Sequence, residues 1–124
     1  MQGISSKKRF YKRITTDTTT TLIKKETGGG GLKGDIRSIT ITNIDSLPAV
    51  GIEVFIEDEF TAVTTNALNR KYYFIKGIDI PVGVALVLKD VDIPLKFNSR
   101  FFHLRMKTNH ASDGTDPILN VIIE

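Results

Sequence analysis

About three in ten residues of this 124-residue sequence are branched at Cβ. Ile, Val and Thr together supply 38 residues, whereas Ala supplies only five. Side chains branched at Cβ lose rotamer freedom in a helix and pack well on a pleated sheet. We therefore expect an all-β protein. The length is sufficient for one domain with a single core and too short for two.

Candidate strands follow one another with turn-forming residues between them. Apolar and polar residues alternate over 39–44 and over 50–56, which is typical of strands with one buried face. We expect these two strands to pair as a hairpin. The run 84–88 (VALVL) is apolar throughout, so we expect it in the centre of a sheet. Further candidate strands are residues 18–25, 71–75, 101–107 and 118–123. Seven or eight strands at this spacing predict an antiparallel β-sandwich or jelly-roll.

The first 34 residues are expected to lie outside the β body, which would occupy residues 35–124. Residues 1–15 show no sustained hydrophobic period and predict an extended arm, and the glycines at 28–31 predict a flexible loop. The run 18–25 is the candidate strand of this segment. Because an arm is dispensable for folding, we expect a chain without residues 1–16 to fold and to lose its ability to assemble.

The net charge of +3 conceals three blocks of opposite sign. Residues 1–16 carry five bases and no acid, residues 38–69 carry five acids and no base, and residues 70–107 return to a net charge of +5. Opposite blocks can attract one another between copies of a protein or attract a charged partner. Solvated faces of a single domain explain the two later blocks equally well.

Two sets of residues are candidates for these contacts. The first is the arm, where bases lie beside two aromatic residues: Lys7, Lys8, Arg9, Phe10, Tyr11, Lys12 and Arg13. The second is a charge-complementary surface formed by acidic residues: Glu53, Glu57, Asp58 and Glu59. Glu53 and Glu57 are expected on the solvent side of the strand 50–56, because they alternate with its apolar residues.

No pattern in the sequence predicts catalysis or a cofactor. The chain has no cysteine, which excludes disulfides and thiolate chemistry. Gly29, Gly31 and Gly34 match G-x-G-x-x-G, but a β-branched strand follows them instead of the helix that a dinucleotide site needs. We therefore interpret this segment as a hinge or loop, and we expect a protein that is not an enzyme.

Metal sites are weakly indicated. The histidines at 103 and 110 lack metal-ligand spacing. The aspartates at 90 and 92, and those at 113 and 116, fit turns in which the side chain bonds to its own backbone. A calcium site at 113–116 is the alternative for the second pair.

The sequence also bears on nucleic-acid and membrane partners. Aromatic residues 72–74 follow bases at 70 and 71, a pattern that can stack on single-stranded nucleic acid but that more commonly belongs to a core. No apolar run is long enough for a membrane span, and the basic start has no apolar run after it, so neither a membrane partner nor a targeting segment is expected.

The order of several segments resembles that of small virion structural proteins of tailed bacteriophages, particularly cyanophage-like ones. The resemblance covers residues 36–124 and rests on SITITN at 38–43, the strand around 54–56, YYFIK at 72–76, the strand at 102–107 and an apolar last strand. Its most specific part is IPVG at 80–83 followed by LVL at 86–88, after an aromatic strand. The basic arm and the glycine loop lie outside it.

The resemblance implies a non-enzymatic β-sandwich protein of the virion, made in the host cytoplasm. Its expected role is capsid decoration or cementing, and a head-to-tail neck or tail role is the alternative. The implied partners are the major capsid protein or neck proteins and further copies of the chain, with nucleic acid reached only through the basic arm. A carbohydrate- or nucleic-acid-binding β module is the alternative of a different class.

Overall fold

The structure is a computed structural model that describes residues 9–16, 18–24, 36–58, 71–97, 102–109 and 117–124. These residues form eight strands and no helix, so the all-β prediction is confirmed. The strands are β1 (Phe10–Ile14), β2 (Thr20–Ile23), β3 (Ser38–Asn43), β4 (Ala49–Glu57), β5 (Lys71–Ile80), β6 (Ala85–Lys89), β7 (His103–Asn109) and β8 (Leu119–Ile123).

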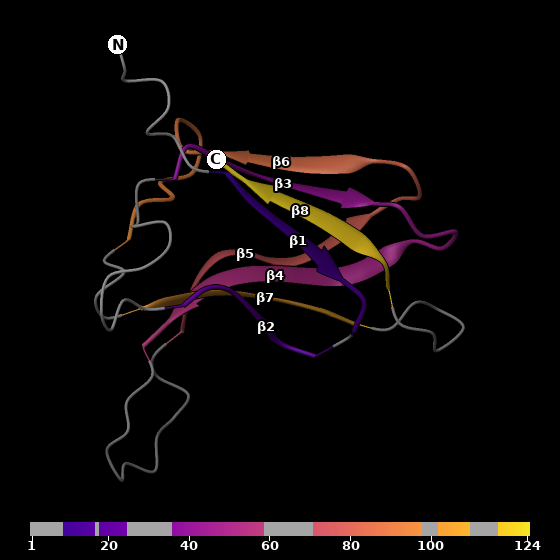
Figure 1. The fold of residues 1–124 in the computed structure, drawn as a ribbon, viewed down its shortest axis with the longest axis horizontal. Coiled ribbons are helices and arrows are strands. Elements are labelled where there is room, and N and C mark those ends of the chain that lie inside the picture. Colours follow the sequence, from indigo (N-terminus) through magenta and orange to yellow (C-terminus); the bar gives the residue numbers. More distant parts are fainter. Residues whose placement is uncertain (1–8, 17, 25–35, 59–70, 98–101, 110–116) are drawn as a thin grey trace, which may run out of the picture.

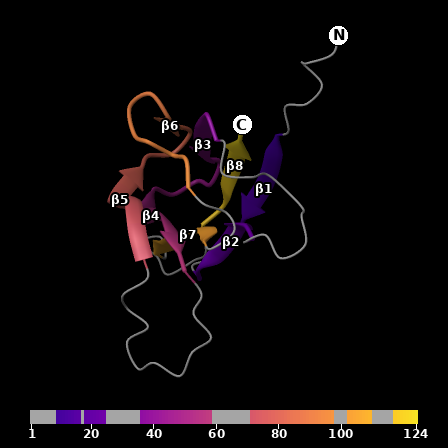
Figure 2. The ribbon, with the colours of Figure 1, turned by 90° about the vertical axis from the view of Figure 1, so that its left-hand side faces the viewer.

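The strands form two four-stranded antiparallel sheets, with the orders β1-β8-β3-β6 and β2-β7-β4-β5 (Figure 1). The pairs are nested along the chain: β4 pairs with β5, β3 with β6, β2 with β7, and β1 with β8. This pattern is that of one long antiparallel ribbon wrapped on itself, and it is the strand order of a jelly roll. The predicted antiparallel sandwich is therefore confirmed. Figure 2 shows the two sheets as separate layers.

The inner faces of the two sheets enclose one core. Eight of its 17 buried residues in the described part of the chain are isoleucine, which explains how a sequence so rich in branched side chains and so poor in alanine fills the space between the sheets. On β3 the buried residues Ile39 and Ile41 alternate with half-buried threonines. On β7 the buried Leu104 and Met106 alternate with bases.

Asn43 joins three segments where β3 ends. Its side chain is fully buried, and its Nδ2 donates hydrogen bonds to the carbonyl oxygens of Leu47 (2.8 Å) and Ile80 (2.9 Å). Its Oδ1 accepts a hydrogen bond from the backbone N–H of Asp45 (2.9 Å). These contacts fix the connection 44–48 and tie the end of β5 to the opposite sheet. A buried amide is stable here because its side-chain donor and acceptor are both satisfied.

The prediction that β3 and β4 pair as a hairpin is wrong. β3 lies between β8 and β6, and β4 lies between β7 and β5 in the other sheet. The connection 44–48 therefore crosses from one sheet to the other. The alternation in each strand correctly indicates which side faces the core, but it contains no information about which strand lies alongside.

The expected boundary between arm and β body is corrected, because Phe10–Ile14 and Thr20–Ile23 are strands of the two sheets. The second of them lies within the candidate strand 18–25, which is confirmed. Phe10 and Ile14 face the core, as do their partners in β8. Lys12 occupies the core-facing position between them but is exposed, because β1 is an edge strand and a long side chain can reach water around it. This lysine interrupts the apolar alternation by which β1 would have been predicted. Residues 1–8 and the glycine loop lie outside the described residues.

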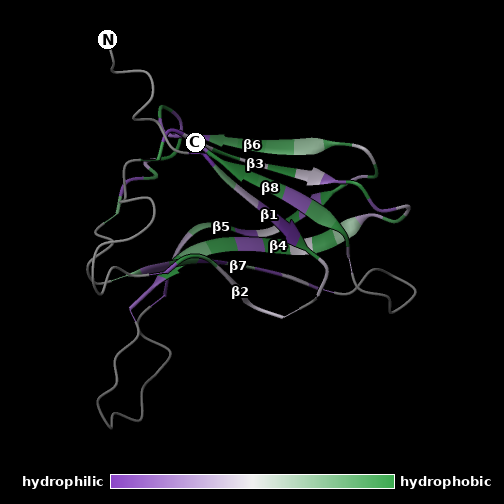
Figure 3. Cartoon of the chain, in the orientation of Figure 1, coloured by the Kyte–Doolittle hydropathy of each residue, from purple (hydrophilic) through white to green (hydrophobic). Residues whose placement is uncertain are grey.

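The run 84–88 is an edge strand and not the central strand we expected. β6 pairs with β3 on one side, and no described strand pairs with its other side. Leu86 and Leu88 face the core, whereas Val87 points outward and is 46% exposed. Figure 3 shows β6 as hydrophobic along most of its length. The outward apolar residues of β6 are therefore not explained by burial within this chain.

The placement of β1 changes the expected effect of deleting residues 1–16. The deletion removes a strand that covers the edge of β8 and two core-facing residues, so the remaining chain is expected to unfold at a lower urea concentration than the full chain. Deletion of residues 1–8, which leaves all eight strands, is the matched control. Equal urea midpoints for the two truncated chains would show that β1 does not contribute to the fold.

Asn43→Ala is expected to destabilise the fold by about 2–4 kcal/mol, because it leaves one buried carbonyl group, one partly buried carbonyl group and one N–H without their partner. Asn120→Ala is the control, because Asn120 lies on a solvent-facing position and accepts one exposed hydrogen bond from Arg13. Its cost should stay below about 0.5 kcal/mol in urea unfolding monitored by circular dichroism. Similar costs for both variants would contradict the clamping role of Asn43.

Candidate interaction surface

The outer side of the sheet β1-β8-β3-β6 carries a row of uncharged side chains. Antiparallel partners point to the same side of a sheet. Tyr11 is paired with Ile122, Ile122 with Thr40, and Thr40 with Val87, so these four residues cross the whole sheet side by side. Tyr11 is 67% exposed and Val87 is 46% exposed. The row is thus a strip of accessible apolar and hydroxyl groups.

Several of the outward residues around this row are also uncharged. We call this surface the neutral face, and it consists of Tyr11, Ser38, Thr40, Thr42, Ile44, Ala85, Val87, Ile118, Asn120 and Ile122. Ile44 and Ile118 extend it beyond the strand ends, where the Ile44 N–H donates to the Ile118 carbonyl oxygen (3.1 Å). Charge on the described part of this outer side occurs toward its rim, at Arg13 and Lys89 within the strands and at the ion pair of Arg9 and Glu124 one residue beyond β1 and β8.

A hollow of about 370 Å3 lies at the β1 side of the neutral face, between β1 and β8. Its lining includes Tyr11, Arg13, Asn120 and Ile122. The Nε of Arg13 donates to Oδ1 of Asn120 (3.1 Å), which holds the guanidinium along the strand pair. A shallow hollow with an aromatic wall can accommodate a protruding side chain of a partner.

The outer side of the sheet β2-β7-β4-β5 carries charged side chains, and these largely contact other side chains of the same face. Nη1 of Arg105 lies 2.6 Å from Oε1 of Glu57, and its Nε donates to the hydroxyl of Thr21 (3.0 Å). Both partners of the ion pair are about one-fifth exposed, so water screens the pair only in part. This network connects β2, β7 and β4 across the face.

Phe55 is fully buried although it points to the outer side of this sheet. The ring of Tyr73 covers it at a centroid distance of 5.2 Å, and Nζ of Lys71 lies 5.0 Å from its ring centroid. Nζ of Lys76 lies 4.7 Å from the centroid of the Tyr73 ring. Long side chains therefore form a second small cluster above the sheet. The aromatic rings expected either to stack on nucleic acid or to join a core are used in part for this packing.

The structure separates the predicted arm residues from one another. Arg9 lies 3.3 Å from the carboxylate of Glu124 in an exposed ion pair. Phe10 packs against the core, whereas Tyr11 lies on the neutral face. Lys12 and Arg13 are exposed on the edge strand, and Lys7 and Lys8 lie outside the described residues. The described arm residues thus belong to an edge strand, β1, that has exposed basic side chains.

The predicted acidic surface is also only partly brought together. Glu53 and Glu57 share the outer side of β4, as the alternation predicted. Glu57 is bound by Arg105, and Glu53 pairs in register with Lys107 of β7. Asp58 follows β4, and Glu59 lies outside the described residues. The two described strand acids thus face bases of their own chain.

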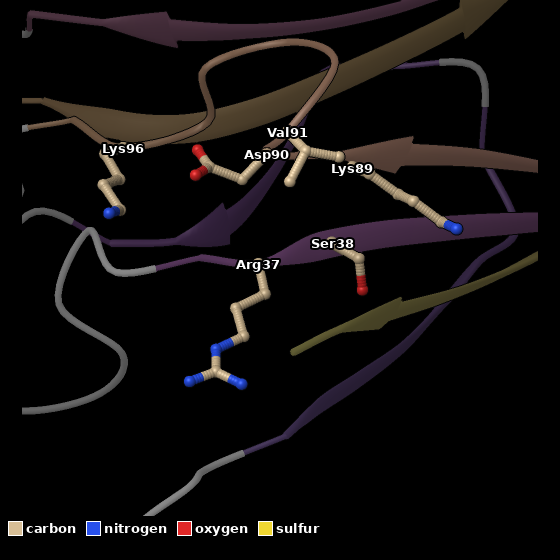
Figure 4. A pocket seen from close by; sticks show the side chains of 6 residues that line it. All are labelled: Arg37, Ser38, Lys89, Asp90, Val91 and Lys96. Carbon is tan, nitrogen blue, oxygen red and sulfur yellow. The ribbon is translucent and has the colours of Figure 1, made fainter.

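A second hollow, of about 480 Å3, lies beside the turn that follows β6. Arg37, Lys89 and Lys96 give it a positive charge, but Figure 4 shows their cationic groups pointing to different sides and not converging on one point. The fourth charged residue, Asp90, accepts a hydrogen bond at Oδ1 from the Leu95 N–H (2.8 Å). This bond is the turn chemistry that we predicted for Asp90.

The neutral face was not recognised in the sequence, apart from Tyr11. A signal was present, because the outward positions of 38–44, 84–88 and 118–122 lack acidic and basic side chains. Outward positions of an exposed strand usually carry polar or charged residues, so uncharged alternate positions on several strands would have indicated a contact surface.

The comparisons with known proteins give no family. No protein-family model matches the chain, and no curated protein matches it significantly. In the described part of the chain, no group of three or more His, Asp or Glu side chains is placed to hold a metal ion. That part also contains no helix that could cross a membrane. The G-x-G-x-x-G glycines, His110 and the aspartates at 113 and 116 lie outside it.

A double-mutant cycle with Arg105→Met and Glu57→Gln is expected to give a coupling energy of about 1–2 kcal/mol, because the ion pair is largely shielded from water. The same cycle with Arg9→Met and Glu124→Gln is the control. Its coupling should be smaller, because those side chains are 60% and 44% exposed. Urea unfolding of the four chains of each cycle gives both values. Equal coupling energies would show that burial does not strengthen the Glu57–Arg105 ion pair.

Proposed function

We propose that this chain is a non-enzymatic virion structural protein of a tailed bacteriophage, and that it decorates or cements the capsid through its neutral face. The observation that carries the proposal is the neutral face, the uncharged residues that cross the outer side of the sheet β1-β8-β3-β6. Such a face loses little hydration energy when it is covered, and its exposed apolar groups gain from burial. The resemblance of residues 36–124 to small phage virion proteins supports the same role.

The basic rim favours a partner of complementary charge. Arg13 lies at one side of the neutral face and Lys89 at the other. A capsid surface that offers a neutral centre and acidic side chains around it would fit this pattern, since charged rims set orientation while the centre supplies the burial. The jelly-roll strand order is compatible with this role because it is common in capsid domains. It also occurs in lectin domains, so the fold alone does not select the function.

Copy number in purified particles separates capsid decoration from a neck or tail role. A decoration protein is expected in roughly hundreds of copies per virion, whereas a ring at the neck or tail contains about six to twelve. Quantitative mass spectrometry with isotope-labelled peptides of this chain measures the number directly. Hundreds of copies support the proposal, a ring-like number supports the neck or tail alternative, and absence from particles rejects both. Glycan-array binding by the isolated protein together with absence from particles would support the carbohydrate-binding alternative.

Thr40→Arg is expected to reduce incorporation into virions at least about tenfold, because a charge at the centre of the neutral face would be buried against the capsid without a partner. Its side chain points outward, so the variant should fold. Thr19→Arg is the matched control, with the same change at an exposed position before β2. Incorporation is measured as variant copies per particle after purification. If both variants enter virions as well as the unmodified chain, the neutral face is not the capsid contact.

A further inference from the structure

Each sheet of the sandwich has two edge strands, and three of these four carry features that discourage pairing with another chain. β1 places Lys12 on the core-facing side at the sheet edge. β2 is four residues long, and its register shifts between Thr21 and Ile23. β5 has several register shifts against β4 and a glycine at positive φ, Gly77. Inward charges, short strands and bulges are the devices by which proteins protect exposed edges.

β6 lacks these devices. Its register with β3 runs without a shift from Ser38 and Lys89 to Thr42 and Ala85. Four of its five residues are uncharged and apolar, and the fifth, Lys89, lies at its end with an outward side chain. Its sequence is typical of a strand in the centre of a sheet, yet its place is at the edge. A strand on its free side would resolve this difference.

The backbone of β6 is oriented for such pairing. The Asn43 N–H donates to the Val84 carbonyl oxygen, and the Glu124 N–H donates to the Ser38 carbonyl oxygen. The backbone groups of alternate β3 residues therefore point to β6 and to β8 in turn. It follows from the register that Leu86 and Leu88 point their backbone groups toward β3, whereas Ala85, Val87 and Lys89 point theirs away from it.

We propose that β6 pairs antiparallel with β6 of a second copy about a two-fold axis through Val87. The inference deepens the proposed function and rests on it, because it names the contact through which copies would join. Val87 would exchange two backbone hydrogen bonds with Val87 of the second copy, and Ala85 would face Lys89 of the second copy twice. The sheet β1-β8-β3-β6 of one copy would then join the same sheet of the second copy, and together they would form one sheet of eight strands.

A second copy is the occupant that the residues favour. A two-fold antiparallel arrangement is self-complementary, so the same five residues supply both sides of the contact. It sets each Lys89 opposite the small Ala85 and keeps the two lysines at opposite ends of the paired strands, whereas a parallel arrangement would set the lysines side by side. The outward valines would meet at the axis, which buries the exposed apolar surface of β6.

The contact is expected to be weak by itself. Pairing of five-residue strands buries less than the roughly 1,200 Å2 of total surface that marks the lower end of stable interfaces. The protein should therefore dimerise in a concentration-dependent manner. Sedimentation equilibrium of the full chain over about a hundredfold range of concentration measures this self-association.

The substitution Val87→Lys tests whether the two copies pair about a two-fold axis at residue 87. The two new charges would face each other across it, so dimerisation should weaken at least about tenfold. Val91→Lys is the matched control, because it adds the same charge in the turn beyond β6, where Val91 is 87% exposed. Thermal unfolding of both variants shows that the monomer is intact. A full chain that stays monomeric throughout the range, or a Val87→Lys variant that dimerises as well as Val91→Lys, would overturn the proposal.

A single cysteine gives a positive test that does not depend on loss of binding. The chain contains no cysteine, so Val87→Cys introduces its only thiol. Hydrogen-bonded antiparallel partners have Cα atoms about 5.5 Å apart, which lies within the range for a disulfide. Mild oxidation should therefore convert Val87→Cys to a covalent dimer much faster than Val91→Cys. Equal rates would contradict the two-fold pairing.

These results can be separated from those on the proposed function. A covalent Val87→Cys dimer of a protein that is absent from virions would retain the contact and reject the virion role. A protein that is abundant in virions but monomeric in solution, with no rapid cross-link at position 87, would retain the virion role and reject the β6 contact.

Discussion

The pairing of β8 with both β1 and β3 is the interaction on which the rest of the structure depends. Phe10 pairs with Ile123, and Ile123 pairs with Ile39, so strands more than a hundred residues apart in the sequence meet in one row of the sheet. The sheet β1-β8-β3-β6 cannot close before the last residues of the chain are in place. Pairing between residues this distant in sequence requires a long loop to close, which is expected to make folding slow.

The same pairing determines what the outer side of the sheet displays. Because side chains alternate along a strand, burial of Leu119, Val121 and Ile123 forces Asn120 and Ile122 outward. The core therefore decides which positions are outward but not which residue types occupy them. The other sheet has the same geometry, and its outer side carries a network of bases and acids with an aromatic pair under it. The uncharged neutral face on the outer side is thus a property that folding does not require.

Local patterns in the sequence were sufficient for the fold class and for the orientation of most strands. The alternation in β4 correctly set Ile52 and Val54 inward and Glu53 outward, because burial of one face is a local property. The neighbours of each strand were not predictable in this way. β3 and β4 each have a clear inner side, yet each finds its neighbours far along the chain. Lys12 concealed β1 because an edge strand tolerates a charge at a core-facing position.

The candidate site was also predictable only in part, because the neighbours of a strand cannot be predicted from its local pattern. Tyr11 was identified as one of the aromatic residues among the basic ones, but its role as a member of an uncharged row depends on the partners Ile122, Thr40 and Val87. Tyr11 and these three partners come from four separate segments, so their proximity exists only once the register is known. The position of β6 at the edge of the described sheet is a tertiary property as well, since its apolar sequence by itself predicts a central strand.

The edge of β6 with which no described strand pairs and the neutral face belong to one sheet, and this has a physical consequence for assembly. If two copies pair through β6, the row from Tyr11 to Val87 continues into the second copy, because paired residues point to the same side of a sheet. A dimer would then present two neutral faces in a fixed relation. A sheet of eight strands is twisted, so the combined surface would be saddle-shaped and would select a partner of matching curvature. Two linked faces bind such a partner more tightly than one, because attachment of the first holds the second at a high effective concentration. A weak edge contact and a modest face can in this way give stable attachment together, although neither would do so alone.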